Sequence, residues 1–259
     1  MHWQRLGFSV LVAALLALAG NAAPGLAGQS GRAQGAGEDA DELPPVVYPA
    51  IPAKVENRSA LVPPGWTIDA EASGDLDGDR RPDLALVIRS QTPDLTASGK
   101  PLVGPRMLIV AFAANGQSPG RNAYERVAVN HRFIPRSNNG EVEDCFHADE
   151  DALSITGGKL VLTLNFFASA GSWSTWSKTY TFGWQNGTAM LERFASTDTD
   201  RSSGEMLDTV ADYRTRRLML GRGTIESDAL KTRTSRLRGP VRVSLEGVGS
   251  GMDFEPVAR

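Results

Sequence analysis

Apolar residues occur along this chain in short runs rather than at helical spacing. After Gly65, runs rich in β-branched and aromatic residues alternate with turn-forming Gly, Pro, Asn and Asp. The runs lie at 66–72, 84–90, 106–113, 124–134, 153–156, 159–167, 178–185, 188–194, 216–220 and 241–248. Only residues 204–217 suggest a turn or two of helix. We therefore expect a mainly β protein with a single antiparallel β domain, built as a sandwich, an open barrel or partial propeller-like sheets.

Two pairs of these runs are joined by turn dipeptides typical of β-hairpins. Gly157-Gly158 separates the first pair and Asn186-Gly187 the second, and both dipeptides accept the positive φ angles of a two-residue turn. In the run 178–185, which precedes Asn186-Gly187, Tyr180, Phe182 and Trp184 stand at alternate positions and share one face. We expect that face to be buried.

The N-terminus has the layout of a secretory signal peptide, residues 1–27. A short start with one positive charge precedes the apolar run 6–19, and small residues follow it. Cleavage after Ala22 or Ala27 fits the small-residue rule, and the run is short for a membrane span. The mature protein is expected to be periplasmic or secreted, with no membrane span after cleavage.

Residues 28–64 are rich in Gly, Pro and charge. Such a composition buries too little apolar surface to offset the entropy of ordering, so we expect a flexible linker. Its latter part could instead lie against the domain as an extended arm. The β domain is expected to span residues 65–259.

Cysteine content and charge exclude two classes of protein. Cys145 is the only cysteine, so an intrachain disulfide is impossible. The net charge of −3 gives no whole-protein case for nucleic-acid binding.

The segment 74–87, GDLDGDRRPDLALV, places carboxylates at alternating positions in a turn between two strands. Counted from Asp75, the aspartates Asp77, Asp79 and Asp83 occupy positions three, five and nine, and Arg81 at position seven offers its backbone carbonyl. A ladder of oxygens around a turn suits Ca²⁺, which takes six to eight oxygen ligands. Zinc is a poor candidate because no histidine or cysteine is near.

The loop is not an EF-hand, because position six is Arg80 instead of Gly and position twelve is Leu86 instead of Glu. It resembles the calcium loop of the FG-GAP and VCBS repeat families, in which a GDLNGDG-x-x-DL stretch precedes a short apolar strand. The resemblance implies that Asp75, Asp77, Asp79 and Asp83 are side-chain ligands of a structural calcium ion. Arg80 stands where that family usually has Gly.

No second loop of this kind follows, and we find no repeat near forty residues, so a propeller is not implied. The order of the aspartate loop, RMLIVAF and GSWSTWSKTYTFGWQNG also resembles a group of exported bacterial proteins with one such loop. That group implies no particular activity.

Aromatic residues are concentrated in GSWSTWSKTYTFGW. Trp184 continues the buried alternation, whereas Trp173 and Trp176 stand in a Ser-rich stretch and are candidate contacts to a ligand.

No residue carries a convincing catalytic pattern. Cys145 and His147 lie in an acidic cluster whose charges oppose formation of a thiolate. His131 has no sequence neighbour with which to act, and no G-x-S-x-G motif is present.

The C-terminal part is strongly basic. Its cationic residues are Arg214, Arg216, Arg217, Arg222, Lys231, Arg233, Arg236, Arg238 and Arg242. They form either a solvated surface or a face for an anionic polymer or acidic protein of the cell envelope.

Two functions fit these patterns. The first, which we favour, is an exported, calcium-stabilised binding module for a protein or glycan of the cell envelope. The alternative is an envelope hydrolase in which the calcium is structural.

Overall fold

The computed structural model describes residues 43–96, 98–114, 123–137, 140–148, 152–240 and 242–256. The predicted signal peptide and the first part of the predicted linker lie outside these residues, as does Asp149 of the acidic cluster around Cys145. None of the described helices has the length and apolar character needed to cross a membrane.

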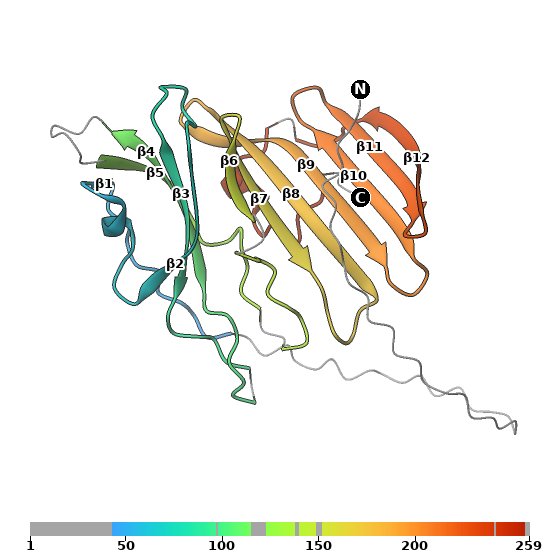
Figure 1. Cartoon of the computed structure of the whole chain (residues 1–259), viewed down its shortest axis with the longest axis horizontal. Helices are drawn as coiled ribbons and strands as arrows, with labels where there is room; N and C mark the ends of the chain where they lie inside the picture. Colours follow the sequence, from blue (N-terminus) through green and yellow to red (C-terminus); the bar gives the residue numbers. More distant parts are fainter. Residues whose placement is uncertain are drawn as a thin grey trace, which may run out of the picture. The chain divides into compact units, whose positions relative to one another are not determined.

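Two antiparallel sheets contain the strands (Figure 1). The five-stranded sheet has the order β1-β5-β4-β3-β2. Its strands are β1 (Lys54–Val55), β2 (Trp66–Gly74), β3 (Asp83–Ser90), β4 (Arg106–Ala114) and β5 (Ala123–Asn130). A short 3-10 helix, η1 (Arg58–Leu61), lies between β1 and β2.

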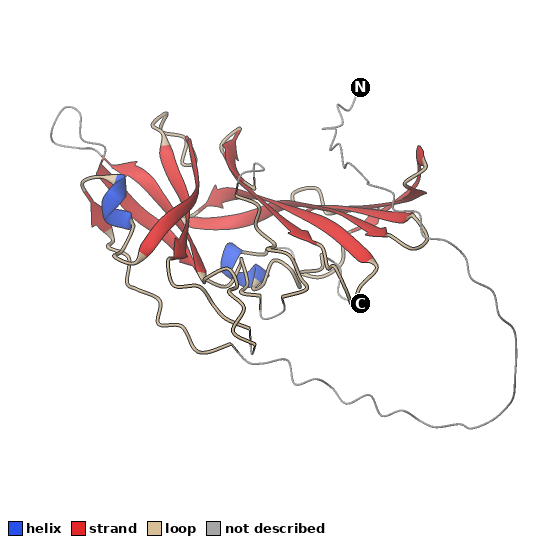
Figure 2. Ribbon diagram, turned by 60° about the horizontal axis from the view of Figure 1, so that its bottom comes forward, coloured by secondary structure: helices blue, strands red, loops and turns tan. Residues whose placement is uncertain are grey.

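The seven-stranded sheet is a simple meander in which each strand pairs with the next along the chain. Its strands are β6 (Leu153–Thr156), β7 (Lys159–Phe166), β8 (Ser174–Gln185), β9 (Thr188–Asp200), β10 (Glu205–Asp212), β11 (Arg217–Thr224) and β12 (Ser227–Arg236). One turn of helix, α1 (Leu245–Val248), follows. Neither sheet is closed, as the ribbon in Figure 2 shows. The mainly β, antiparallel fold predicted from the sequence is confirmed.

Both predicted hairpins are present. Gly157 and Gly158 join β6 to β7 with φ angles of 58° and 72°. Asn186 and Gly187 join β8 to β9 with φ angles of 50° and 78°. Both dipeptides therefore supply the left-handed backbone that such turns require.

Two predictions in the C-terminal part were wrong, and one strand was not predicted. The helical turn expected within 204–217 is strand β10, because pairing with β9 and β11 overrides a weak local preference. The strand expected at 241–248 instead contains α1, which Ser244 caps by accepting a hydrogen bond from the Gly247 N–H. Strand β12 was missed because its sequence, SDALKTRTSR, is mostly polar.

The core of the domain lies where the two sheets meet. One continuous apolar cluster joins Val87 and Leu108 of the five-stranded sheet to the side chains of β7, β8 and β9. Phe133 packs edge-to-face on both Tyr180 and Phe182 within it, so the predicted buried face of β8 is confirmed. Strand β6 contacts β2 and β3.

The opposite face of the five-stranded sheet is covered by residues that precede β2. Ile51, Val55 and Leu61 pack there against Leu86 and Ile109. The segment from residue 48 to residue 64, assigned to the linker from its composition, therefore lies against the domain as the extended arm that the sequence left open. The folded domain begins before Gly65.

Candidate metal site and ligand-binding surfaces

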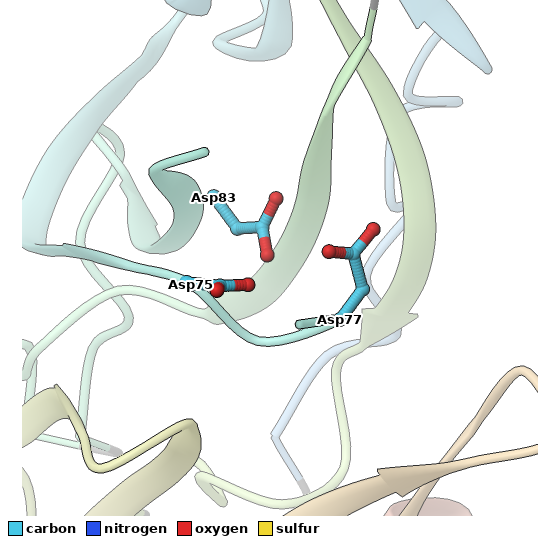
Figure 3. A group of neighbouring side chains, drawn as sticks. All are labelled: Asp75, Asp77 and Asp83. Carbon is cyan, nitrogen blue, oxygen red and sulfur yellow. The ribbon is translucent and has the colours of Figure 1, made fainter. Parts of the chain in front are cut away.

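The aspartate loop connects β2 to β3, and the pair Gly74 and Asp83 closes its base. One carboxylate oxygen from each of Asp75, Asp77 and Asp83 lies within 4.8 Å of the others. Figure 3 shows these three carboxyl groups gathered around one space. Three of the predicted ligands are therefore brought together.

Asp83 is the buried member of the group, with no exposed surface. Its Oδ2 accepts a hydrogen bond from the Leu76 N–H at 2.7 Å, and its Oδ1 accepts one from the Ala113 N–H at 2.8 Å. Burial raises the pKa of Asp83, with the nearby charge of Asp77 acting in the same direction, although the two amide hydrogen bonds oppose this. The guanidinium of Arg81, which is hydrogen-bonded to Asp79, also attracts Asp77 and Asp83 electrostatically.

Asp75 and Asp77 shape the turn itself. Asp75 accepts hydrogen bonds from the N–H groups of Gly78 and Arg80 at 2.7 and 2.9 Å, and Asp77 accepts one from Asp79 at 3.0 Å. These side-chain-to-backbone bonds hold the loop in a tight conformation that keeps the carboxylates close.

Asp79 is not part of the cluster. Its carboxylate accepts hydrogen bonds from the backbone N–H and the Nε of Arg81, at 2.8 and 2.6 Å. The side-chain hydrogen bond from Arg81 is the main cause of a lowered pKa of Asp79. The pattern of spacing therefore placed Asp79 in a ligand set that the structure does not bring together, and the carbonyl of Arg81 stays a prediction.

Arg80 has a left-handed backbone, with φ of 68°. A residue with a Cβ atom is strained there by about 1 kcal/mol relative to Gly. The departure from the glycine usual in the FG-GAP and VCBS loop thus has a physical cost in the turn.

The loop lies against the β6–β7 turn of the other sheet. A Cβ added to Gly158 would lie 3.5 Å from the Asp75 carbonyl oxygen, and one added to Gly74 would lie 2.6 Å from Cγ2 of Ile155. The aspartate cluster thus stands where the two sheets contact each other.

The donor set fits a hard cation. Three carboxylates, one of them buried, present only oxygen ligands, which is the chemistry that Ca²⁺ prefers. Neither histidine nor cysteine belongs to the group, so a zinc site does not fit.

The residues considered for catalysis are engaged in packing. Cys145 is buried between the sheets, and desolvation raises the pKa of its thiol to about 12. The ring of His131 stacks on Tyr48 with centroids 4.3 Å apart.

A cleft of about 370 Å³ opens beside Cys145. Its apolar wall includes Leu102, Val142 and Phe166, and the guanidinium of Arg106 lies at its base. The sequence analysis did not single out Arg106, although it is among the most buried charged residues of the described chain.

Arg106 joins three segments that are distant in sequence. Its Nε donates to Asp69 of β2 at 2.6 Å, and its Nη1 donates to Asp144 at 2.6 Å. Asp69 also accepts from Arg89 at 3.0 Å. No local signal marks this cluster, because its partners are 37 and 38 residues from Arg106.

The two candidate aromatic contacts differ in exposure. Trp173 is 67% exposed. Trp176 is half-buried, stacks on Phe166 at 5.4 Å and lies 4.6 Å from the Lys178 ammonium. Trp184 packs edge-to-face on Phe112 between the sheets, at 4.9 Å.

The basic residues are spread over β11, β12 and the segments that flank them. Arg216 is half-buried and donates to the Leu237 carbonyl at 3.1 Å, and Arg214 lies 3.8 Å from Glu192. The other members are exposed.

Comparison with known proteins does not assign the chain to a family. No protein-family model matches the chain, and no curated protein and no solved structure matches it.

Proposed function

We propose that this protein is an exported binding module of the cell envelope whose β2–β3 loop holds a structural calcium ion. The observation that carries the proposal is the gathering of Asp75, Asp77 and Asp83 within 4.8 Å at the contact between the two sheets. A cation there offsets the mutual repulsion of three close carboxylates.

The ion would act on folding. Asp83 is buried and hydrogen-bonded to β4 through Ala113, so a cation bound to it ties the loop to the centre of the five-stranded sheet. Because the cluster assembles only when β2 and β3 pair, calcium binds the folded state and stabilises it by mass action. The gain is about 2.7 kcal/mol at a calcium concentration one hundred times the Kd.

A binding role is favoured over the alternative of an envelope hydrolase. The thiol of Cys145 is buried with a raised pKa, which opposes its use as a nucleophile, and His131 is occupied by stacking on Tyr48. The cleft beside Arg106 and the exposed Trp173 are surfaces for contact rather than assembled catalytic groups.

Thermal unfolding with excess chelator and then with millimolar calcium tests the proposal. Calcium should raise the Tm of the wild-type protein, and Asp77→Ala should abolish that rise. Asp79→Ala is a matched control in the same loop. It should keep the calcium-dependent rise, because the Asp79 carboxylate is paired with Arg81 and lies outside the cluster.

A wild-type melting curve that is identical with chelator and with calcium would contradict the calcium site. Magnesium should raise the Tm less than calcium does, because Mg²⁺ demands near-octahedral geometry that this loop is not expected to supply. An equal rise in Tm with magnesium would contradict the assignment of the ion as calcium.

A further inference from the structure

Strand β12 is the last strand of the seven-stranded sheet and is ten residues long. Among the described residues, β11 is the only strand hydrogen-bonded to it, so its other edge presents unpaired backbone N–H and C=O groups (Figure 1). Residues 231–236 are all exposed. An edge of this length is a template for a further strand, and proteins usually shorten or cover such edges.

Positive charge is concentrated at this edge, on both faces of the sheet. Lys231 and Arg233 alternate on one face, where Arg222 of β11 is directly opposite Lys231. Arg236 lies on the other face, opposite Arg217 of β11. No salt bridge joins any of these five side chains to an acid of the described residues.

Apart from Asp228 near the start of β12, the acids of the sheet lie on strands farther from the edge. Asp198 of β9 and Glu205 of β10 line an open hollow that Arg222 and Lys231 border on the side of β12. Positive charge therefore increases from the middle of the sheet toward its free edge.

These charges discriminate between partners. Two copies of β12 paired with each other would bring Lys231, Arg233 and Arg236 close to the same residues of the other copy, which is unfavourable. An extended segment with acidic residues at alternate positions would place opposite charges across the new pair of strands. The edge is thus protected against its own copy and complementary to an acidic strand.

We propose that the free edge of β12 binds an extended acidic segment of a partner protein by strand addition. The partner's backbone pairs with β12, and its carboxylates contact Lys231, Arg233 and Arg222. A carboxylated polysaccharide would meet the same charges, but it has no backbone groups that match the strand's spacing. The inference rests on the proposed role as a binding module and names the chemistry of its partner.

Fluorescence anisotropy with the full mature protein tests this inference. The probe is a labelled eight-residue peptide with Glu at alternate positions and Val or Thr between them. A second peptide of the same sequence is N-methylated at its central residues, which keeps its charge and removes its backbone donors. Binding of the first peptide and loss of binding by the second are expected.

Charge reversal at the edge should weaken the first peptide at least about tenfold. The variant is Lys231→Glu with Arg233→Glu, and the matched control is Lys54→Glu with Arg132→Glu, which changes the net charge equally away from β12. Lys54 makes only a 3.8 Å salt bridge between exposed side chains, and Arg132 is exposed. The control should bind like the wild type.

Three results would each overturn the inference: no binding of the acidic peptide, equal binding of the N-methylated peptide, or equal loss in the control variant. Polygalacturonate that binds while the peptide does not would assign the charges to a polysaccharide instead. Repeating the titration with chelator and with calcium separates the two proposals. Peptide binding without any calcium effect on the Tm would contradict the proposed calcium site alone. A calcium effect on the Tm without peptide binding would contradict the proposed role of the β12 edge alone.

Discussion

The outer faces of the two sheets differ in their exposure to solvent. On the five-stranded sheet, Leu86, Ile88 and Ile109 are completely buried beneath residues 48–64. On the seven-stranded sheet, the face opposite the core carries Thr163, Thr179 and their polar neighbours, half-exposed. One sheet thus has two buried faces, whereas the other has one buried face and one face open to solvent.

The difference follows from side-chain patterns. Strands β3 and β4 are apolar at nearly every position and need cover on both sides, and the segment before β2 supplies it. Strands β7 and β8 alternate buried residues, most of them apolar, with half-exposed and mostly polar residues, and need cover on one side only. The uncovered sheet therefore leaves one face and the β12 edge open to solvent, and that edge is where we propose that a partner binds.

A substitution in the segment that covers the five-stranded sheet is expected to have the largest effect on the free energy of unfolding. Leu61→Ala should reduce the free energy of unfolding by about 2–5 kcal/mol, because Leu61 is 0% exposed and its loss leaves a cavity. Urea unfolding measures the change. Met219→Ala on the open face, where Met219 is 37% exposed, should change it by no more than about 0.5 kcal/mol. Equal costs for the two variants would remove the distinction between the faces.

Arg106→Ala should cost about 3 kcal/mol, because the buried carboxylate of Asp69 and that of Asp144 lose their shared partner. The same urea experiment checks this. Arg132→Ala, an exposed arginine, is the control and should leave the unfolding curve unchanged. A small effect of Arg106→Ala would mean that solvent replaces the ion pair.

Alkaline pH should weaken the region between the sheets. The pKa of Cys145 is about 12 in the folded protein against a normal value of 9.0, so above pH 9 the folded state keeps a proton that the unfolded state loses. The free energy of unfolding therefore falls as pH rises from 9 to 12. The contribution at pH 10 is on the order of 1 kcal/mol.

Cys145→Ala isolates this contribution. Its stability should fall less steeply between pH 8 and pH 10 than that of the wild type, as followed by chemical unfolding at each pH. Parallel slopes would show that the thiol does not titrate with a raised pKa.

Arg80→Gly should give the smallest change, and in the opposite direction. Relief of the left-handed strain at φ 68° is expected to stabilise the protein by about 1 kcal/mol, measured with chelator present. Gly78→Ala, at φ 89°, is the reverse substitution and should destabilise it by a similar amount. Two changes of the same sign would show that backbone conformation does not control this loop.

Local patterns were sufficient for much of the domain. Turn dipeptides located both hairpins, because Gly157-Gly158 and Asn186-Gly187 have few other ways to connect strands. The spacing of aspartates predicted that Asp75, Asp77 and Asp83, three of the four side chains proposed as ligands, lie close together, because neighbours around a short turn are near in space.

Other features arose only in the tertiary structure, where contacts join segments far apart in sequence. The Asp79 carboxylate lies outside the cluster because it is hydrogen-bonded to Arg81. The polar segment of β12 forms a strand because it is hydrogen-bonded to β11. The Arg106 ion pairs and the packing of Leu61 also depend on distant partners. By composition alone, the segment that contains Leu61 resembles a linker. The sequence by itself determined the strand-rich fold, its turns and its oxygen-rich loop. Tertiary packing determined which carboxylates meet, which face is covered and which edge stays free, because those outcomes depend on which surfaces are left after the sheets have formed.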